Sequence, residues 1–203
     1  FGLVTGNWKL AFTRKTETVS ASRRRLASAF NEVLVTPELI VEWNHTYIEF
    51  ITPPGQGQNR TLNFTVGDQI AEFPSTTLSF SYNRPSISGY QPTTGLVTEG
   101  GVVLTILGTS FGVSNAVVTI LDPLANSTND RMTAKLCELL SQDHEQITCK
   151  LPIGVGGDLE LHLNVDDSSD VFAFAYDPPV IDFFWSSSGG SAAGGEELRI
   201  YGQ

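Results

Sequence analysis

Several residues of this 203-residue chain have types and spacings that can do chemistry. Gly108-Thr109-Ser110-Phe111-Gly112 matches the G-x-S-x-G pattern of a nucleophile elbow, which requires a strand, a sharp turn and then a helix. The residues that follow, Val117-Val118-Thr119-Ile120, alternate as a strand does. We therefore expect no nucleophile at Ser110.

The histidines and one acidic run are the other candidates for catalysis or metal binding. His45 and His144 hold matching places just before two expected strands, and His162 alternates with apolar neighbours, which predicts a surface position. The run 166–170 (Asp-Asp-Ser-Ser-Asp) carries oxygen ligands for calcium but lacks EF-hand spacing, and we expect a solvated turn. Gly154-Val155-Gly156-Gly157 lacks the Lys-Ser/Thr of a phosphate loop. We predict no enzyme, no metal site and no cofactor.

Cys137 and Cys149 lie 12 residues apart, each near an expected strand. We favour a disulfide between them, with two buried free thiols as the alternative. Four Asn-x-Ser/Thr sites predict N-linked glycans at Asn44, Asn59, Asn63 and Asn126. A disulfide, these sites and an acidic charge together favour an extracellular or cell-surface location.

Composition excludes several classes of protein. The net charge of −10 argues against nucleic-acid binding, which uses basic faces. We interpret the single basic cluster, Arg23-Arg24-Arg25, as part of a solvated loop or strand edge. No apolar run approaches the ~20 residues needed to span a bilayer, so we expect no direct membrane insertion by this segment. With 40% hydrophobic and 17% charged residues, the chain has material for packed cores.

The elements that must position these residues recur along the chain. Gly100-Gly101-Val102-Val103-Leu104-Thr105-Ile106-Leu107-Gly108 returns 94 residues later, beginning at Gly194-Gly195, and the chain opens on the Phe1-Gly2 that closes the same motif. The stretch from His45 to Gly57 aligns with the stretch from His144 to Gly156 at an offset of 99. A fixed period predicts an array of like domains.

Apolar residues alternate with polar ones in short runs bounded by Gly, Pro, Asn or Asp, which is typical of an all-β sandwich. Two segments, 20–35 and 133–140, read as short helices or loops. The joints Asn83-Arg84-Pro85 and Asp177-Pro178-Pro179 leave almost no linker, and proline restricts the backbone there. We expect neighbouring units to be held at a restricted angle, as in a semi-rigid rod.

The motif Gly-Gly-x-x-Leu-x-Ile-x-Gly-x-x-Phe-Gly, with Pro85 before it and Cys137, Cys149 and Phe174-Ala175-Tyr176 after it, resembles the IPT/TIG family of immunoglobulin-like domains. The resemblance implies tandem immunoglobulin-like β-sandwiches of the early-set type. It divides the chain into residues 1–83, a domain that lacks its first strands and both cysteines, residues 84–178, a complete domain, and residues 179–203, the opening strands of a third.

The family is used for spacing, adhesion or recognition, so the resemblance implies a non-catalytic repeat of a secreted, glycosylated surface protein. We expect a filament or extended stalk whose partners are copies of the same protein or adjacent repeats. Two explanations remain open for the incomplete units at the two ends. The chain is a window of a longer array, or it is the repeating unit of a polymer in which residues 179–203 complete the first unit of the next copy by strand addition. The alternatives are a receptor or adhesion ectodomain that binds a protein partner, and an accessory module of a secreted carbohydrate-active enzyme.

Overall fold

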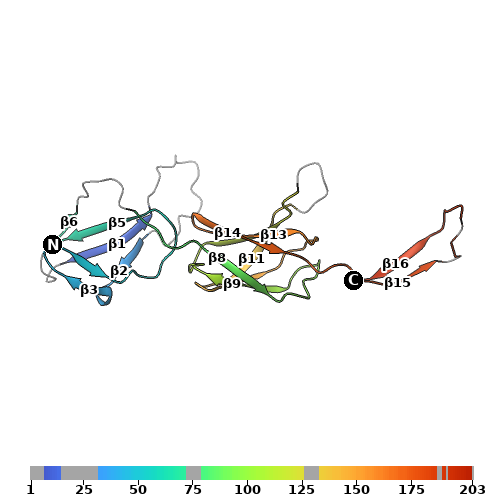
Figure 1. The fold of residues 1–203 in the computed structure, drawn as a ribbon, viewed down its shortest axis with the longest axis horizontal. Helices are drawn as coiled ribbons and strands as arrows, with labels where there is room; N and C mark the ends of the chain where they lie inside the picture. The colour runs from blue at the N-terminus through green and yellow to red at the C-terminus, as the bar shows by residue number, and fades with distance from the viewer. Residues whose placement is uncertain are drawn as a thin grey trace.

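The computed structural model describes residues 7–14, 32–71, 79–125, 133–186, 189–190 and 192–202. Within these residues every regular element is a β-strand, apart from one 3₁₀ turn, η1 (Pro37–Leu39). Three bodies follow one another along the long axis of the molecule: strands β1–β7, strands β8–β14, and a hairpin of β15 and β16 (Figure 1). We call them unit 1, unit 2 and the terminal hairpin. The predicted all-β fold is confirmed.

Unit 2 is a sandwich built from one antiparallel path of seven strands, in the order β14-β13-β10-β11-β12-β9-β8. Its inner face is fully buried: Leu104 and Ile106 of one layer and Leu161 and Leu163 of the other are all 0% exposed. Burying each such side chain contributes roughly 1.5–3 kcal/mol. The strands are β8 (Ser86–Gln91), β9 (Val103–Thr109), β10 (Ala116–Leu121), β11 (Lys135–Gln142), β12 (Gln146–Lys150), β13 (Leu159–Val165) and β14 (Ser168–Phe174).

Strand β11 passes from one layer of the sandwich to the other. Its first residues pair with β10 and its later residues pair with β12, with a bulge between Leu139 and Ser141. The expectation of a helix or loop over 133–140 is therefore wrong. The leucines of this segment favour a helix weakly, but pairing to two strands supplies backbone hydrogen bonds that override a propensity of a few tenths of a kcal/mol per residue.

The disulfide between Cys137 and Cys149 is formed and joins β11 to β12 where β11 changes layers. The two cysteines are 1% and 0% exposed, and their Cα atoms are 5.6 Å apart. The alternative of two free thiols is therefore wrong. In the chain-entropy account, a crosslink closing a loop of this size stabilises the fold by about 3 kcal/mol.

Unit 1 repeats this pairing scheme in seven strands of its own, without counterparts of β8 and β9 among the described residues. Its strands are β1 (Trp8–Arg14), β2 (Glu32–Val35), β3 (Ile40–Trp43), β4 (Ile48–Phe50), β5 (Arg60–Val66), β6 (Gln69–Ile70) and β7 (Ser79–Phe80). One sheet has the order β2-β1-β5-β6, with β7 also on β5, and the other is the pair β3-β4. The segment 20–35, expected as a helix or loop, ends as strand β2, and residues 20–31 lie outside the described residues.

The register shows what replaces the disulfide in unit 1. Leu10 pairs with Val35 as Val118 pairs with Cys137, and Ile40 pairs with Phe50 as Leu139 pairs with Cys149. Val35 and Phe50 therefore stand in the two cysteine positions. The Phe50 ring packs on Phe12, with centroids 6.0 Å apart. The turn η1 stands between β2 and β3, where unit 2 has the single strand β11.

A tyrosine closes the same loop in both units. The hydroxyl of Tyr82 donates to the carbonyl of Pro53 at 3.0 Å, and that of Tyr176 donates to the carbonyl of Pro152 at 2.7 Å. The backbone N–H groups of these tyrosines donate to the carbonyls of Gly57 and Gly156. Loops 53–57 and 152–156 therefore occupy matching places at the far ends of the two units.

The terminal hairpin pairs β15 (Ile181–Ser186) with β16 (Leu198–Gly202) and repeats the geometry of β8 and β9. Its register shift lies between Ile181 and Phe183, and that of unit 2 lies between Ile87 and Gly89, at the same offset of 94 residues. Leu198 and Ile200, which match the fully buried Leu104 and Ile106, are 56% and 62% exposed. The apolar face of this hairpin is uncovered by the described chain.

Candidate functional site

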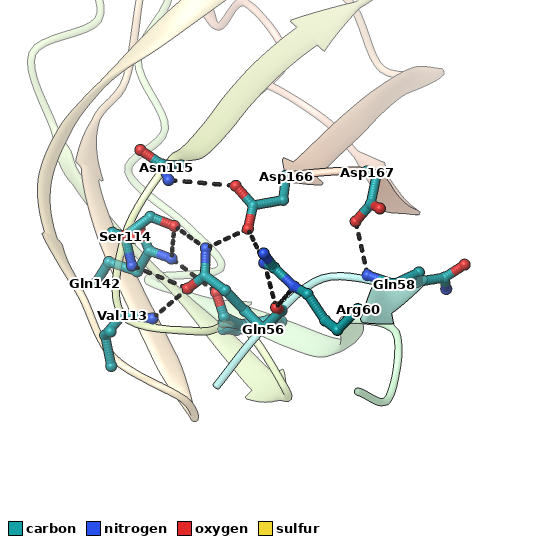
Figure 2. A network of polar contacts seen from close by, with 10 residues as sticks. Gln56, Gln58, Arg60, Val113, Ser114, Asn115, Gln142, Asp166 and Asp167 are labelled. Atoms are coloured by element: carbon teal, nitrogen blue, oxygen red, sulfur yellow. Dashed lines mark hydrogen bonds and ion pairs between the residues drawn. The ribbon is translucent and has the colours of Figure 1, made fainter. Parts of the chain in front are cut away.

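A cluster of polar side chains lies at the joint between units 1 and 2, with Gln56 at its centre (Figure 2). The side-chain amide of Gln56 donates to the carbonyl of Ser114 at 2.8 Å and to Oδ2 of Asp166 at 3.0 Å. Its oxygen accepts from the backbone N–H groups of Val113 at 2.9 Å and Ser114 at 3.3 Å. All donor and acceptor positions of the amide are used, and the residue is only 5% exposed.

Arg60 and Asp166 form an ion pair across the same joint. Nη2 of Arg60 lies 3.1 Å from Oδ2 of Asp166, and the two side chains are 2% and 4% exposed. Nε and Nη2 of Arg60 also donate to the carbonyl of Gln56, at 2.9 Å and 2.5 Å. Nη1 of Arg60 is buried without a hydrogen-bond partner. Removing one member of such a pair leaves an uncompensated buried charge, which is strongly destabilising.

Unit 2 holds its side of the joint with a second set of contacts. Gln142, at the end of β11, donates to the carbonyls of Phe111 and Ser114, and its oxygen accepts from the N–H of Ala116. These hydrogen bonds hold in place the loop to which the Gln56 side chain binds. Gly112 sits in this loop at φ +71°, and a Cβ there would collide with the Gln56 side chain.

The hairpin turn between β13 and β14 provides the acids of the joint. Asp166 also accepts from the amide of Asn115 at 3.2 Å, and Asp167 accepts from the backbone N–H of Gln58 at 2.9 Å. The sequence predicted a solvated turn for 166–170, with calcium as the alternative. Neither prediction describes Asp166, which is buried against Arg60 of the neighbouring unit. Asp170 accepts from the N–H of Ile87 at 2.7 Å and ties β14 to the start of β8.

Burial affects the hydroxyls of the tyrosines beside the two loops. Burial raises the pKa of Tyr176 to about 12. Burial also raises the pKa of Tyr82, and the Arg60 charge opposes that shift. Both hydroxyls therefore stay protonated as donors to the proline carbonyls through the neutral range.

The residues that the sequence singled out for catalysis do not come together. Ser110 has φ +61° and leads to strand β10 rather than to a helix. His162 pairs with Glu160 at 2.8 Å on the outer face of β13, and the backbone carbonyl of His144 accepts from the N–H of Phe111. In the part of the chain that the structure describes, no three His, Cys, Asp or Glu side chains gather as metal ligands. Nor does any helix there have the length and apolar character to span a membrane.

Three of the four expected glycan acceptors lie in described residues. Asn59 and Asn63 are exposed, and Asn44 forms an Asx turn that accepts from the hydroxyl and the N–H of Thr46. Asn126 and the basic cluster at Arg23, Arg24 and Arg25 lie outside the described residues.

Comparison with known proteins identifies the class of unit 2. Residues 85–176 match the family model of the IPT/TIG domain, so this part of the chain is an IPT/TIG domain with an immunoglobulin-like sandwich. The chain is also similar to human Fibrocystin-L, with 29% identity over 125 residues. That match covers 58% of this chain and 3% of the human protein. Together these likenesses support a module of the ectodomain type.

Sequence reasoning missed Gln56 and Arg60, the two unit 1 residues at the centre of the joint. The signal was present in the alignment of the repeats, because Gln56 and Arg60 stand where unit 2 has Val155 and Leu159. Polar residues at positions that are apolar in the other copy mark contacts that only one copy makes.

Truncating Asp166 tests the joint. We expect Asp166→Ala to lower the free energy of unfolding by about 3–5 kcal/mol, because Arg60 stays buried without its partner. Adding Arg60→Leu, the residue type of unit 2, is expected to recover most of that loss. Denaturant unfolding followed by circular dichroism measures both effects. Asp167→Ala, which removes an exposed contact, serves as the control and should cost about 1 kcal/mol or less; an equal cost for Asp166→Ala would contradict a buried pair.

Proposed function

We propose that this chain is a non-catalytic stalk segment of a secreted or cell-surface glycoprotein, in which stiff joints hold β-sandwiches in line. The observation that carries the proposal is the joint itself, where Gln56 and Arg60 are buried in a neighbouring unit. A flexible linker would leave these polar groups in water. The short connection Asn83-Arg84-Pro85 supports the same conclusion, because proline restricts its own φ and that of its predecessor.

Small-angle scattering in solution tests the stalk. We expect the wild-type profile to fit one elongated particle with units 1 and 2 end to end, because the joint fixes their angle. We expect Asp166→Ala with Gln56→Ala to broaden the distance distribution through bending at residue 83. A wild-type profile that requires many inter-unit angles would overturn the stalk. Lys9→Ala, which removes an exposed ion pair within unit 1, is the control.

The extracellular part of the proposal rests on the disulfide and the exposed acceptor sites. A disulfide at buried cysteines fits an oxidising compartment, and the acceptors Asn59 and Asn63 are exposed while Asn44 is half-buried. The likeness to Fibrocystin-L and the ectodomain-type module support the same location.

Expression through a eukaryotic secretory pathway tests the glycans. We expect secreted protein whose mass falls on enzymatic removal of N-glycans, and a smaller fall in Asn63→Gln, because Asn63 faces outward from the centre of β5. Asn164→Gln, which alters an exposed asparagine outside any acceptor sequence, should leave the fall unchanged. An unmodified secreted protein would contradict the glycoprotein assignment.

We further propose that stalk segments join into a filament by strand completion. In unit 2, β9 pairs with β12, whereas β16 pairs only with β15 and β4 pairs only with β3 among the described strands. The terminal hairpin thus offers the strand that β4 lacks. Adding it to unit 1 of a second copy would pair both edges and cover Leu198 and Ile200. Such a head-to-tail contact propagates as an open chain unless rotation closes it.

Sedimentation velocity over a concentration series tests strand completion. We expect wild-type protein to form head-to-tail oligomers, and we expect Ile200→Asp to weaken association by 100-fold or more, because it places a charge in the completed core. Arg199→Asp, on the opposite face of β16, is the control and should associate as the wild type does. Monomers at every concentration, or equal association by both variants, would overturn strand completion.

A further inference from the structure

The far end of unit 2 is the counterpart of the end of unit 1 that forms the observed joint. Loops 53–57 and 152–156 are closed by the same tyrosine contacts. In unit 1 the loop residue Gln56 is 5% exposed because unit 2 covers it. In unit 2 the matching Val155 is 61% exposed, and Ile153 beside it is 73% exposed. This end therefore presents apolar side chains where the other presents polar ones.

The charged residues of the observed joint are replaced by uncharged residues at the matching positions of the other unit. At the observed joint, Arg60 of the first unit meets Asp166 in the β13–β14 turn of the second. The residue of unit 2 that matches Arg60 is Leu159. The residue of unit 1 that matches Asp166 is Gly67, in the β5–β6 turn, and its φ of +54° is close to the +51° of Asp166. Unit 2 thus lacks the cation at its far end, the end with loop 152–156. Unit 1 lacks the acid at its opposite or near end, where the β5–β6 turn lies.

One contact of the observed joint has matching groups both in the β5–β6 turn of unit 1 and at the far end of unit 2. Asp167 accepts from the backbone N–H of Gln58. The matching residues are Asp68, exposed in the β5–β6 turn, and Gly157, exposed after loop 152–156. A backbone N–H is present whatever the side chain, so this carboxylate contact needs no cation. The far end of unit 2 and the β5–β6 turn of unit 1 therefore each lack one member of the ion pair, and each keeps one member of the contact between a carboxylate and a backbone N–H. Two surfaces that meet are expected to be complementary in this way.

We propose that the far end of unit 2, formed by Ile153, Val155 and Gly157, docks the β5–β6 turn of unit 1 of a second copy of this chain. Gly67 lies over Val155, and the carboxylate of Asp68 accepts from the N–H of Gly157. The inference rests on the proposed strand completion, which brings unit 1 of the second copy to this end. It adds a second contact between the two copies beside the paired strands.

The test uses the whole 203-residue chain in sedimentation velocity, with inter-copy affinity as the readout. We expect Gly67→Asp to weaken self-association at least 10-fold, because it buries an acid against Val155. A Cβ at Gly67 meets open space, and Asp166 shows that aspartate accepts this φ, so the variant should fold. Gly67→Asn, of equal size and without charge, is the matched control and should associate within threefold of wild type.

A second variant asks whether the surfaces meet as proposed. Adding Val155→Gln to Gly67→Asp recreates the Gln56–Asp166 contact between copies, and we expect it to recover most of the lost affinity. If Gly67→Asp associates as tightly as the wild type while Ile200→Asp does not associate, the docking is overturned and strand completion is left intact. Wild-type protein that stays monomeric would overturn both and leave the scattering test of the stalk unaffected.

Discussion

A buried charge is tolerated only while its partner stays aligned, and this constraint sets the angle between units 1 and 2. Arg60 cannot move away from Asp166 without leaving a guanidinium desolvated, and Gln56 cannot move without breaking four hydrogen bonds. A purely apolar contact of the same area would allow sliding, since the hydrophobic effect has no direction. The polar centre therefore makes the joint specific in angle, and the elongated arrangement of Figure 1 follows from it.

The two units reach a closed core by different means. Unit 2 uses a disulfide at the point where β11 changes layers, with a large buried cluster around it. Unit 1 has Val35 and Phe50 at those positions and relies on rings: Phe12 packs on Phe80 with centroids 4.8 Å apart, and Trp8 meets Trp43 edge-on at 5.2 Å. Aromatic pairs add roughly 0.5–1.5 kcal/mol each beyond their buried area. Among the described strands of unit 1, β4 pairs only with β3.

Much of the fold was predictable because period-two alternation reports directly which face of a strand is buried. Leu104, Ile106, Leu161 and Leu163 all stand where alternation placed them, and the cysteine pair formed as expected. The strand β11 was missed because its sequence, KLCELLSQ, alternates poorly where it changes layers and its outer residues stay exposed. The joint was missed for another reason: Asp166 has the sequence pattern of a turn residue in its own unit, whereas the arginine that pairs with it lies 106 residues earlier in the chain.

The distribution of polarity between the two ends of unit 2 bears on how an ordered array is specified. If every joint carried the same ion pair, the start of any unit would fit the end of any other, and contacts between copies would have no preferred partner. Here the acid stands only at the near end of unit 2 and the cation only at the far end of unit 1, while Gly67 and Leu159 are neutral. A unit 2 placed after another unit 2 would bury Asp166 against Leu159, and an unpaired buried carboxylate costs several kcal/mol. The choice of partner between copies is then set mainly by the penalty of wrong neighbours, which is how specificity arises when the attractive surfaces are alike.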